Sequence, residues 1–184
     1  GGVNDVFTYT LKDSDNDSDT ATLTISIGNA TPTTNVPVAG GATTTVYEAG
    51  LPARAGESEG SGEAAAAGAN GDVREAVSGT IGFTSADGVS AVTLGGTALT
   101  LAGPFPQTVA TNATGTLVVT GYSYNAGTGA GSISYTYTLL DNTSGDATSA
   151  SFALVVTDRD GDPSPASSLV INIVDDASIA EVDT

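Results

Sequence analysis

The sequence predicts an all-β fold, a two-layer sandwich of short strands, and three observations lead to this prediction. Short runs of alternating apolar residues recur along the chain, as in residues 135–139, YTYTL. Gly, Asn, Asp and Pro separate these runs, which is typical of a β-sandwich or barrel. Residues that favour helices are scarce outside one stretch. Because side chains alternate between the faces of a strand, we expect every second residue of each run in a core.

The runs and breaks divide the chain in order. The predicted strands span residues 5–11, 21–27, 43–47, 78–84, 89–94, 97–101, 115–122, 131–140, 149–157 and 168–174. Residues 31–37 hold two prolines, which favour an extended linker. Residues 53–76 are rich in Ala, Gly, Glu and Ser, and we interpret them as a polar loop inserted after the first strand of the main unit. Within this loop, residues 63–67 favour at most one marginal helical turn.

Two stretches 145 residues apart are near-copies of each other. Phe7 matches Phe152, and each stretch continues into three alternate aspartates. These aspartates are Asp13, Asp15 and Asp17 in the first copy, and Asp158, Asp160 and Asp162 in the second. A second strand follows each acidic loop, LTISI at 23–27 and LVINI at 169–173. A fixed period marks repeated units. We therefore expect residues 1–30 to be the C-terminal strand pair of a preceding repeat with the start of a linker. Residues 31–176 would then be a complete repeat, and 177–184 a linker to the next.

Composition excludes several classes of partner. The 184 residues carry a formal charge of −17, from 21 acidic and four basic side chains. Such a surface repels nucleic acids and anionic membranes, and no apolar run approaches the roughly 20 residues of a membrane span. Cys, His, Met and Trp are absent, so disulfides are impossible and zinc or copper lacks its usual ligands. The remaining ligands are oxygens, which suit hard cations and above all Ca²⁺.

The acidic residues fall into two predicted groups when the strands are arranged as an immunoglobulin-like or cadherin-like Greek key. Loops in such a sandwich gather at two ends. The loop containing Asp87 is expected to meet the loop of Asp158, Asp160 and Asp162 beside the incoming linker. The other end is expected to gather a second group, next to the outgoing linker. Its members are Glu48, Asp141, Asp146, Asp175 and Asp176.

Grouped carboxylates are unfavourable without a cation. Two charges about 5 Å apart repel by roughly 3 kcal/mol at an effective dielectric constant near 20. Four or five such groups approach the whole stability of a domain, about 5–15 kcal/mol. Calcium reverses this repulsion, so we predict Ca²⁺ sites at both groups and at the loop of Asp13, Asp15 and Asp17. The spacing is not that of an EF-hand, because Pro163 and Leu169 stand where Gly and Glu are required. Ordinary polar turns and a solvated acidic coat remain alternative explanations of the acids.

Taken together, these residues resemble the roughly 143-residue repeats of giant type I-secreted RTX-type adhesins, the calcium-dependent surface and biofilm adhesins of Gram-negative bacteria. The matching segments are residues 46–52, 87–89, 94–97, 115–122, 134–139, 141–142, 157–162 and 173–176. The resemblance implies a non-catalytic extender domain, strung in tandem on the outside of the bacterial cell and rigidified by calcium at loops and domain junctions. One departure is that Asn29 and Ala30 end the first copy, where Asp175 and Asp176 end the second.

Three other functions compete with this interpretation, and two of them stay open. A calcium-dependent glycan- or partner-binding module would use the aspartate loops, although no Trp is present and most Tyr and Phe fall in predicted strands. A glycosidase needs two carboxylates about 5–10 Å apart across a cleft, which nothing in the sequence marks, so we predict that the protein is not an enzyme. A strand-exchanging filament subunit is the third, because an isolated hairpin such as residues 1–30 is marginal in water. The expected partners are neighbouring repeats, with homotypic contacts or strand addition through residues 1–30.

Overall fold

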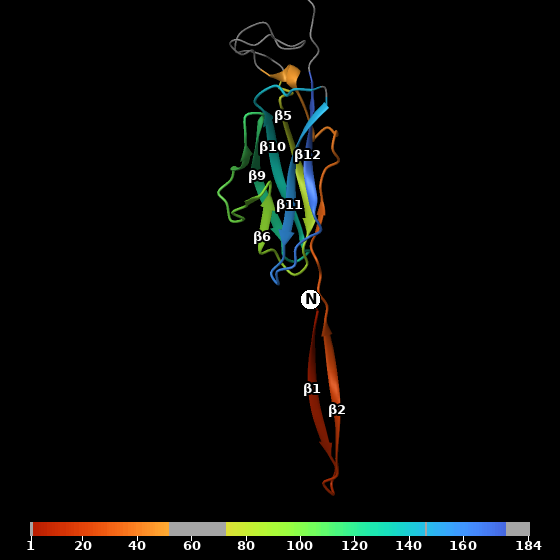
Figure 1. Cartoon of the computed structure of the whole chain (residues 1–184). Helices are drawn as coiled ribbons and strands as arrows, with labels where there is room; N and C mark the ends of the chain where they lie inside the picture. Colours follow the sequence, from red (N-terminus) through yellow and green to blue (C-terminus); the bar gives the residue numbers. More distant parts are fainter. Residues whose placement is uncertain (1, 52–72, 146, 176–184) are drawn as a thin grey trace, which may run out of the picture.

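The computed structural model describes residues 2–51, 73–145 and 147–175. In this part of the chain the fold is all-β, as predicted, and it has two parts. Figure 1 shows a two-stranded hairpin that projects lengthwise from one end of a β-sandwich. No helical segment among the described residues has the length and apolar character needed to cross a membrane.

The hairpin consists of β1 (Val3–Lys12) and β2 (Ser18–Ile27), paired antiparallel. Every residue of both strands is exposed. The register places Phe7 opposite Leu23 and Val3 opposite Ile27, so large apolar side chains share one face. Thr and Ser dominate the other face, where Thr8 lies opposite Thr22.

The sandwich contains two five-stranded sheets. The first has the order β3 (Thr33–Asn35), β5 (Ala76–Thr84), β10 (Ala130–Leu139), β9 (Gly115–Asn125) and β8 (Gln107–Thr111). The second has the order β4 (Thr45–Tyr47), β12 (Ser167–Val174), β11 (Ala147–Thr157), β6 (Ala91–Leu94) and β7 (Thr97–Ala98). A 3₁₀ turn, η1 (Glu48–Gly50), follows β4. Strands β4 and β12 pair in parallel, whereas the other named pairs of the sandwich are antiparallel.

This strand order is that of an immunoglobulin-like sandwich. Strands β3, β5, β10 and β9 take the places of A, B, E and D, and strands β6, β11 and β12 take those of C, F and G. The connection from β5 to β6 crosses between the sheets, as does that from β10 to β11. The turns that connect strands of different sheets therefore gather at the two ends of the sandwich. The loops of Asp87 and Asp141 are among these turns, so they lie at the ends.

The core lies between the sheets, on the faces that the alternation predicts. Tyr135 and Tyr137 of β10 are buried, as are Phe152 and Leu154 of β11. Tyr135 lies over Gly79 of β5, where a Cβ atom would come within 2.4 Å of its Oη, and its hydroxyl donates to a backbone carbonyl at 2.8 Å. A close approach of this kind requires glycine, because any side chain would displace the ring.

Several boundaries differ from the expectation. Strand β3 lies inside residues 31–37, so part of the predicted linker pairs with β5. Strand β8 was not predicted, and the strand expected at 97–101 ends at Ala98. Of the predicted insertion at 53–76, Ala76 already belongs to β5, while residues 53–72 lie outside the described part of the chain. The linker predicted at 177–184 also lies outside it.

Candidate metal centre

The two copies of the acidic loop adopt the same backbone conformation. In the loop between β11 and β12, the Asp158 amide donates to the Asp162 carbonyl at 3.1 Å, and the Asp162 amide donates to Asp158 Oδ1 at 2.8 Å. In the loop between β1 and β2, the Asp13 amide donates to the Asp17 carbonyl at 3.0 Å, and the Asp17 amide donates to Asp13 Oδ1 at 2.9 Å. The sequence copy is therefore also a structural copy.

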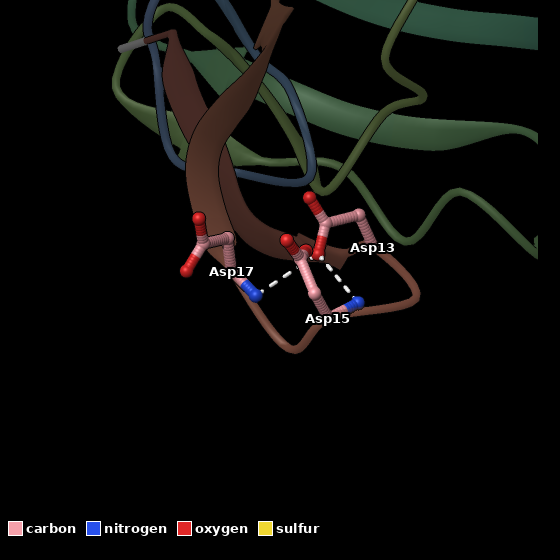
Figure 2. Close-up of side chains that lie close together, drawn as sticks. All are labelled: Asp13, Asp15 and Asp17. Atoms are coloured by element: carbon pink, nitrogen blue, oxygen red, sulfur yellow. Dashed lines mark hydrogen bonds between the residues drawn. The ribbon is translucent and has the colours of Figure 1, made fainter.

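The fourth residue of each loop explains how the aspartates converge. Asn16 has φ of 75° and Gly161 has φ of 97°, a left-handed conformation that Gly and Asn adopt most readily. This bend turns the chain back on itself, so that the first and fifth residues bond to each other. Figure 2 shows the result at the hairpin tip, where Asp13, Asp15 and Asp17 lie close together on one loop.

The loop of the sandwich receives a further aspartate from the β5–β6 connection. Asp87, Asp158 and Asp160 each offer a carboxylate oxygen, and these oxygens lie within 4.8 Å of one another. Ser85 holds the Asp87 loop in place, since its hydroxyl donates to the Gly88 carbonyl at 2.5 Å. The Ser85 carbonyl in turn accepts a hydrogen bond from the Tyr124 hydroxyl at 2.6 Å. The structure thus brings Asp87 to the aspartate loop, as the Greek-key arrangement predicts.

Asp158 is the buried member of this group. Its side chain is 0 % exposed, and its Oδ2 has no hydrogen-bond partner among the described residues. A buried carboxylate oxygen without a partner is unfavourable, because it loses its hydration and gains nothing in return. An oxygen-coordinated cation supplies the missing partner. The donor set of three carboxylates therefore fits a hard divalent ion.

The pKa values of Asp158 and Asp160 are shifted in opposite directions. Burial disfavours the charged form of Asp158, but hydrogen bonds from the Asp160 side chain and from backbone amides of the loop outweigh it and lower its pKa. The same hydrogen bond with Asp158 is the main cause that raises the pKa of Asp160.

The chain leaving the hairpin bonds directly to this end of the sandwich. The Ala30 amide donates to Asp87 Oδ2 at 2.9 Å, and Asn29 Nδ2 donates to Asp162 Oδ2 at 2.5 Å. Asp162 therefore bonds to the segment that joins the hairpin to the sandwich. The other predicted aspartates of this end, Asp87, Asp158 and Asp160, form the acidic cluster. A cavity of about 310 Å³ lies between the hairpin base and the cluster. It is lined by Gly2, Val3, Ile27, Gly28, Asn29, Asp87, Arg159 and Asp160.

The cluster at the hairpin tip has a different character. Asp13, Asp15 and Asp17 are all exposed, so water can solvate each carboxylate. A hydrogen bond with the Asp15 side chain is the main cause that lowers the pKa of Asp13. This loop has the same hydrogen bonds as the sandwich loop, but among the described residues no fourth acidic side chain joins it as Asp87 joins the other.

The opposite end of the sandwich contains Glu48, Asp141 and Asp175 of the second predicted group. Glu48, in η1, is 1 % exposed, and its Oε1 accepts hydrogen bonds from the Thr143 amide at 2.7 Å and the Thr143 hydroxyl at 2.6 Å. Burial, opposed by these bonds and reinforced by Asp175, raises the pKa of Glu48. Asp141 is half-buried and caps the Asn142 amide at 2.9 Å. The predicted ligands Asp146 and Asp176 lie outside the described residues.

Sequence reasoning missed the residues that position the site. Asn29 and Ser85 carry no metal-binding signature, and Tyr124 lies just beyond the strand predicted at residues 115–122. A signal existed for Asn29, which occupies the place of Asp175 in the duplicated segment. No protein-family model matches the chain, and no curated protein matches it either.

Proposed function

We propose that the chain is a non-catalytic extender repeat of a large bacterial surface adhesin, rigidified by Ca²⁺ where one repeat meets the next. The observation that carries this proposal is the pair of hydrogen bonds from Asn29 and Ala30 to the acidic end of the sandwich. Because Ala30 bonds to Asp87, an ion that fixes Asp87 also fixes the connection to the hairpin.

The arrangement of the hairpin supports a tandem array. In β1 and β2, Phe7 pairs with Leu23, and in β11 and β12 the matching Phe152 pairs with Leu169. The loops between the strands have the same hydrogen bonds. The hairpin therefore corresponds to the last strand pair of a sandwich like the one that follows it.

The ligand chemistry supports calcium as the ion. Asp87, Asp158 and Asp160 offer only oxygen atoms, and the chain contains no Cys or His. Calcium binds six to eight oxygen ligands in flexible geometries, so carbonyl groups and water would complete the shell. Extracellular modules bind it with dissociation constants of about 0.1–1 mM. Sites of this strength fill where calcium is abundant, which agrees with the extracellular location that we propose.

The test measures whether calcium narrows the range of hairpin orientations. The chain has no Cys, so a Thr22→Cys, Thr80→Cys double variant can carry two spin labels, one on the hairpin and one on β5. Both positions are exposed. We expect calcium to narrow the distribution of distances between the labels, and Asp158→Asn to abolish the narrowing. An equally broad distribution with calcium and with a chelator would contradict the proposal.

The exposed hairpin favours a second candidate, a subunit that self-associates by strand addition. Phe7 is 53 % exposed and Leu23 is 52 % exposed, and both strands have a free edge in the described structure. Exposed strand edges with apolar side chains are templates for pairing with another chain. Sedimentation equilibrium separates the candidates: a dimer or polymer that Phe7→Lys dissociates supports self-association, and a monomer supports the tandem repeat alone.

A further inference from the structure

A cavity of about 390 Å³ lies at the end of the sandwich away from the hairpin. One of its lining residues, Thr143, also bonds to Glu48 of η1, the turn drawn in orange (Figure 1). The walls come from the turn between β8 and β9, from β10, from the connection between β10 and β11, and from β11 and β12. This volume falls in the range of small-molecule sites.

The lining of the cavity is neutral, although the chain carries a formal charge of −17. Eight of the ten lining residues have hydroxyl or amide side chains, and the other two, Ala150 and Ile173, are apolar. Among the described residues, no acidic or basic side chain lines it. The set does not suit a divalent cation, whose sites contain carboxylates. It does not suit a phosphate or carboxylate group either, since these are bound by Arg or Lys.

Tyr137 of β10 supplies the observation that points to a ligand. Its side chain is 1 % exposed, and its hydroxyl makes no hydrogen bond to any described residue. The hydroxyl lies against Gly115, where a Cβ atom would overlap it. Gly115 ends a turn that Asn112 begins, and Asn112 lines the cavity together with Tyr137. The buried hydroxyl therefore lies at the cavity wall.

Two other tyrosines of the same sheet show the usual arrangement. Tyr135 lies over Gly79, much as Tyr137 lies over Gly115, but its hydroxyl donates to the Thr43 carbonyl at 2.8 Å. The hydroxyl of the half-buried Tyr124 donates to a backbone carbonyl at 2.6 Å. Buried tyrosine hydroxyls normally have such partners, because their lost hydration is otherwise uncompensated. For Tyr137, a molecule in the cavity can be that partner.

Hydrogen bonds within the wall hold further polar groups in place. The hydroxyl groups of Thr143 and Thr148 are 2.6 Å apart. Asn112 Oδ1 accepts hydrogen bonds from two backbone amides of its own turn, at 3.0 and 2.9 Å. Its Nδ2 group and the hydroxyls of Thr114 and Ser144 bond to no described residue. The cavity therefore offers several fixed groups whose hydrogen bonds a ligand can complete.

We propose that this cavity binds a neutral sugar unit. A pyranose ring has several hydroxyl groups and apolar C–H faces, which match the amides and hydroxyls of the wall and the apolar Ala150 and Ile173. Tyr137 Oη, Asn112 Nδ2 and the Ser144 hydroxyl are its expected hydrogen-bond partners. The site goes beyond the proposed function, since it uses neither the acidic cluster nor the connection to the hairpin. It also differs from glycan binding through calcium, because no described carboxylate lines it.

The experiment titrates the ¹⁵N-labelled full chain with the methyl glycosides of glucose, galactose and mannose, and follows the backbone amides by NMR. A ligand of this size should bind with a dissociation constant of about 1–10 mM. We expect at least one glycoside to cause saturable shifts at the amides of Thr114, Gly115 and Ser144, with calcium and with a chelator alike. The corresponding methyl uronide adds a carboxylate and should bind several-fold more weakly, because the chain is strongly acidic.

Two variants test the expected contacts. Tyr137→Phe should weaken binding about two- to tenfold, the usual effect of losing one neutral hydrogen bond. Tyr135→Phe, the matched control, removes a buried hydroxyl of the same strand that does not line the cavity, so it should bind as the wild type does. Asn112→Asp keeps the oxygen that accepts the amides of its turn but removes the Nδ2 donor, and it repeats the test if Tyr137→Phe does not fold.

Saturable shifts that weaken in Tyr137→Phe but not in Tyr135→Phe support the sugar site, whether or not calcium binds at the other end of the sandwich. If none of the three glycosides shifts these amides at about 100 mM, ten times the weakest dissociation constant expected, water alone fills the cavity and the proposal is wrong. Equal affinity in wild type, Tyr137→Phe and Asn112→Asp also contradicts it. Shifts that require calcium and are confined to the Asp87 loop would instead place sugar binding at the acidic cluster.

Discussion

Asn29 and Asp162 are 133 residues apart in the chain, yet the Asn29 side-chain amide donates to the Asp162 carboxylate at 2.5 Å. This contact attaches the hairpin to the loop that carries the acidic cluster. The first copy has the neutral amide of Asn29 at the position where the second copy has the carboxylate of Asp175. The junction before the sandwich is therefore held partly by a direct hydrogen bond.

We expect Asn29→Asp to make the junction more dependent on calcium. The substitution places a carboxylate next to Asp162 and near the cluster, where it repels its neighbours without an ion and offers another ligand with one. The difference in Tm between calcium and chelator should increase. Asn29→Ala, the control, removes the hydrogen bond without adding charge and should leave that difference unchanged. If the two variants respond alike, the charge at this position has no role in ion binding.

Calcium should raise the Tm of the wild type, and removal of one cluster carboxylate should remove much of the rise. At a hundredfold excess over the dissociation constant, one ion adds about 2.7 kcal/mol, or roughly 5–11 °C for a domain of this size. Two occupied sites would raise Tm by about 11–22 °C in total. Asp158→Asn and Asp160→Ala should each reduce the calcium-dependent increase in Tm by the contribution of one site, roughly 5–11 °C. Asp5→Asn, an exposed acid on β1, is the control and should behave as wild type.

The duplicated phenylalanines should differ sharply in their contribution to stability. Phe152 is 9 % exposed and contacts Tyr137, with 5.9 Å between ring centroids. Phe152→Ala should therefore cost about 3–5 kcal/mol of unfolding free energy. Phe7 is 53 % exposed, so Phe7→Ala should change it by at most about 0.5 kcal/mol. Urea unfolding measures both. An equal cost would mean that another molecule covers the hairpin face in solution.

The buried tyrosines should make the sandwich sensitive to alkali. Burial raises the pKa of Tyr137, and also that of Tyr135, where a hydrogen bond to Thr43 opposes it. In the unfolded chain a tyrosine titrates near pH 10. Since the folded pKa is higher, this contribution to stability is complete below about pH 10 and is lost as pH rises through the folded value. The urea concentration at the unfolding midpoint should stay constant up to about pH 9 and fall as the pH rises above about 10. The midpoint of the Tyr137→Phe variant should fall less over the same pH range. An equal fall in variant and wild type would show that ionisation of Tyr137 does not contribute to the loss of stability in alkali.

The sequence predicted most of the fold because its strands alternate strongly. Tyr135 and Leu154 mark inward faces that the structure confirms. Strand β8 escaped prediction because only Val109 of its five residues is buried, so it lacks an alternating pattern. Strand β3 escaped because its three residues are Thr-Thr-Asn, whose pairing with β5 comes from tertiary position and not from local preference.

The candidate site was only partly predictable, for a related reason. Strand direction alone placed Asp87 beside Asp158, because each strand of a sandwich reverses the chain. Burial of individual oxygens depends on packing, which no local pattern encodes. The buried oxygen of Glu75 illustrates this, since it lies at a strand start that the sequence assigned to a polar insertion.

The parallel pairing of β4 with β12 determines how the sandwich bears a load. The Asn172 amide donates to the Thr44 carbonyl at 2.8 Å, and the ladder continues to Val174 opposite Tyr47. A pull between Ala30 and Asp175 drags these two strands along their axes in opposite directions. Their hydrogen bonds are then sheared simultaneously instead of unzipping one at a time. A stretching force between these two ends is therefore resisted by several hydrogen bonds of the β4–β12 ladder at once.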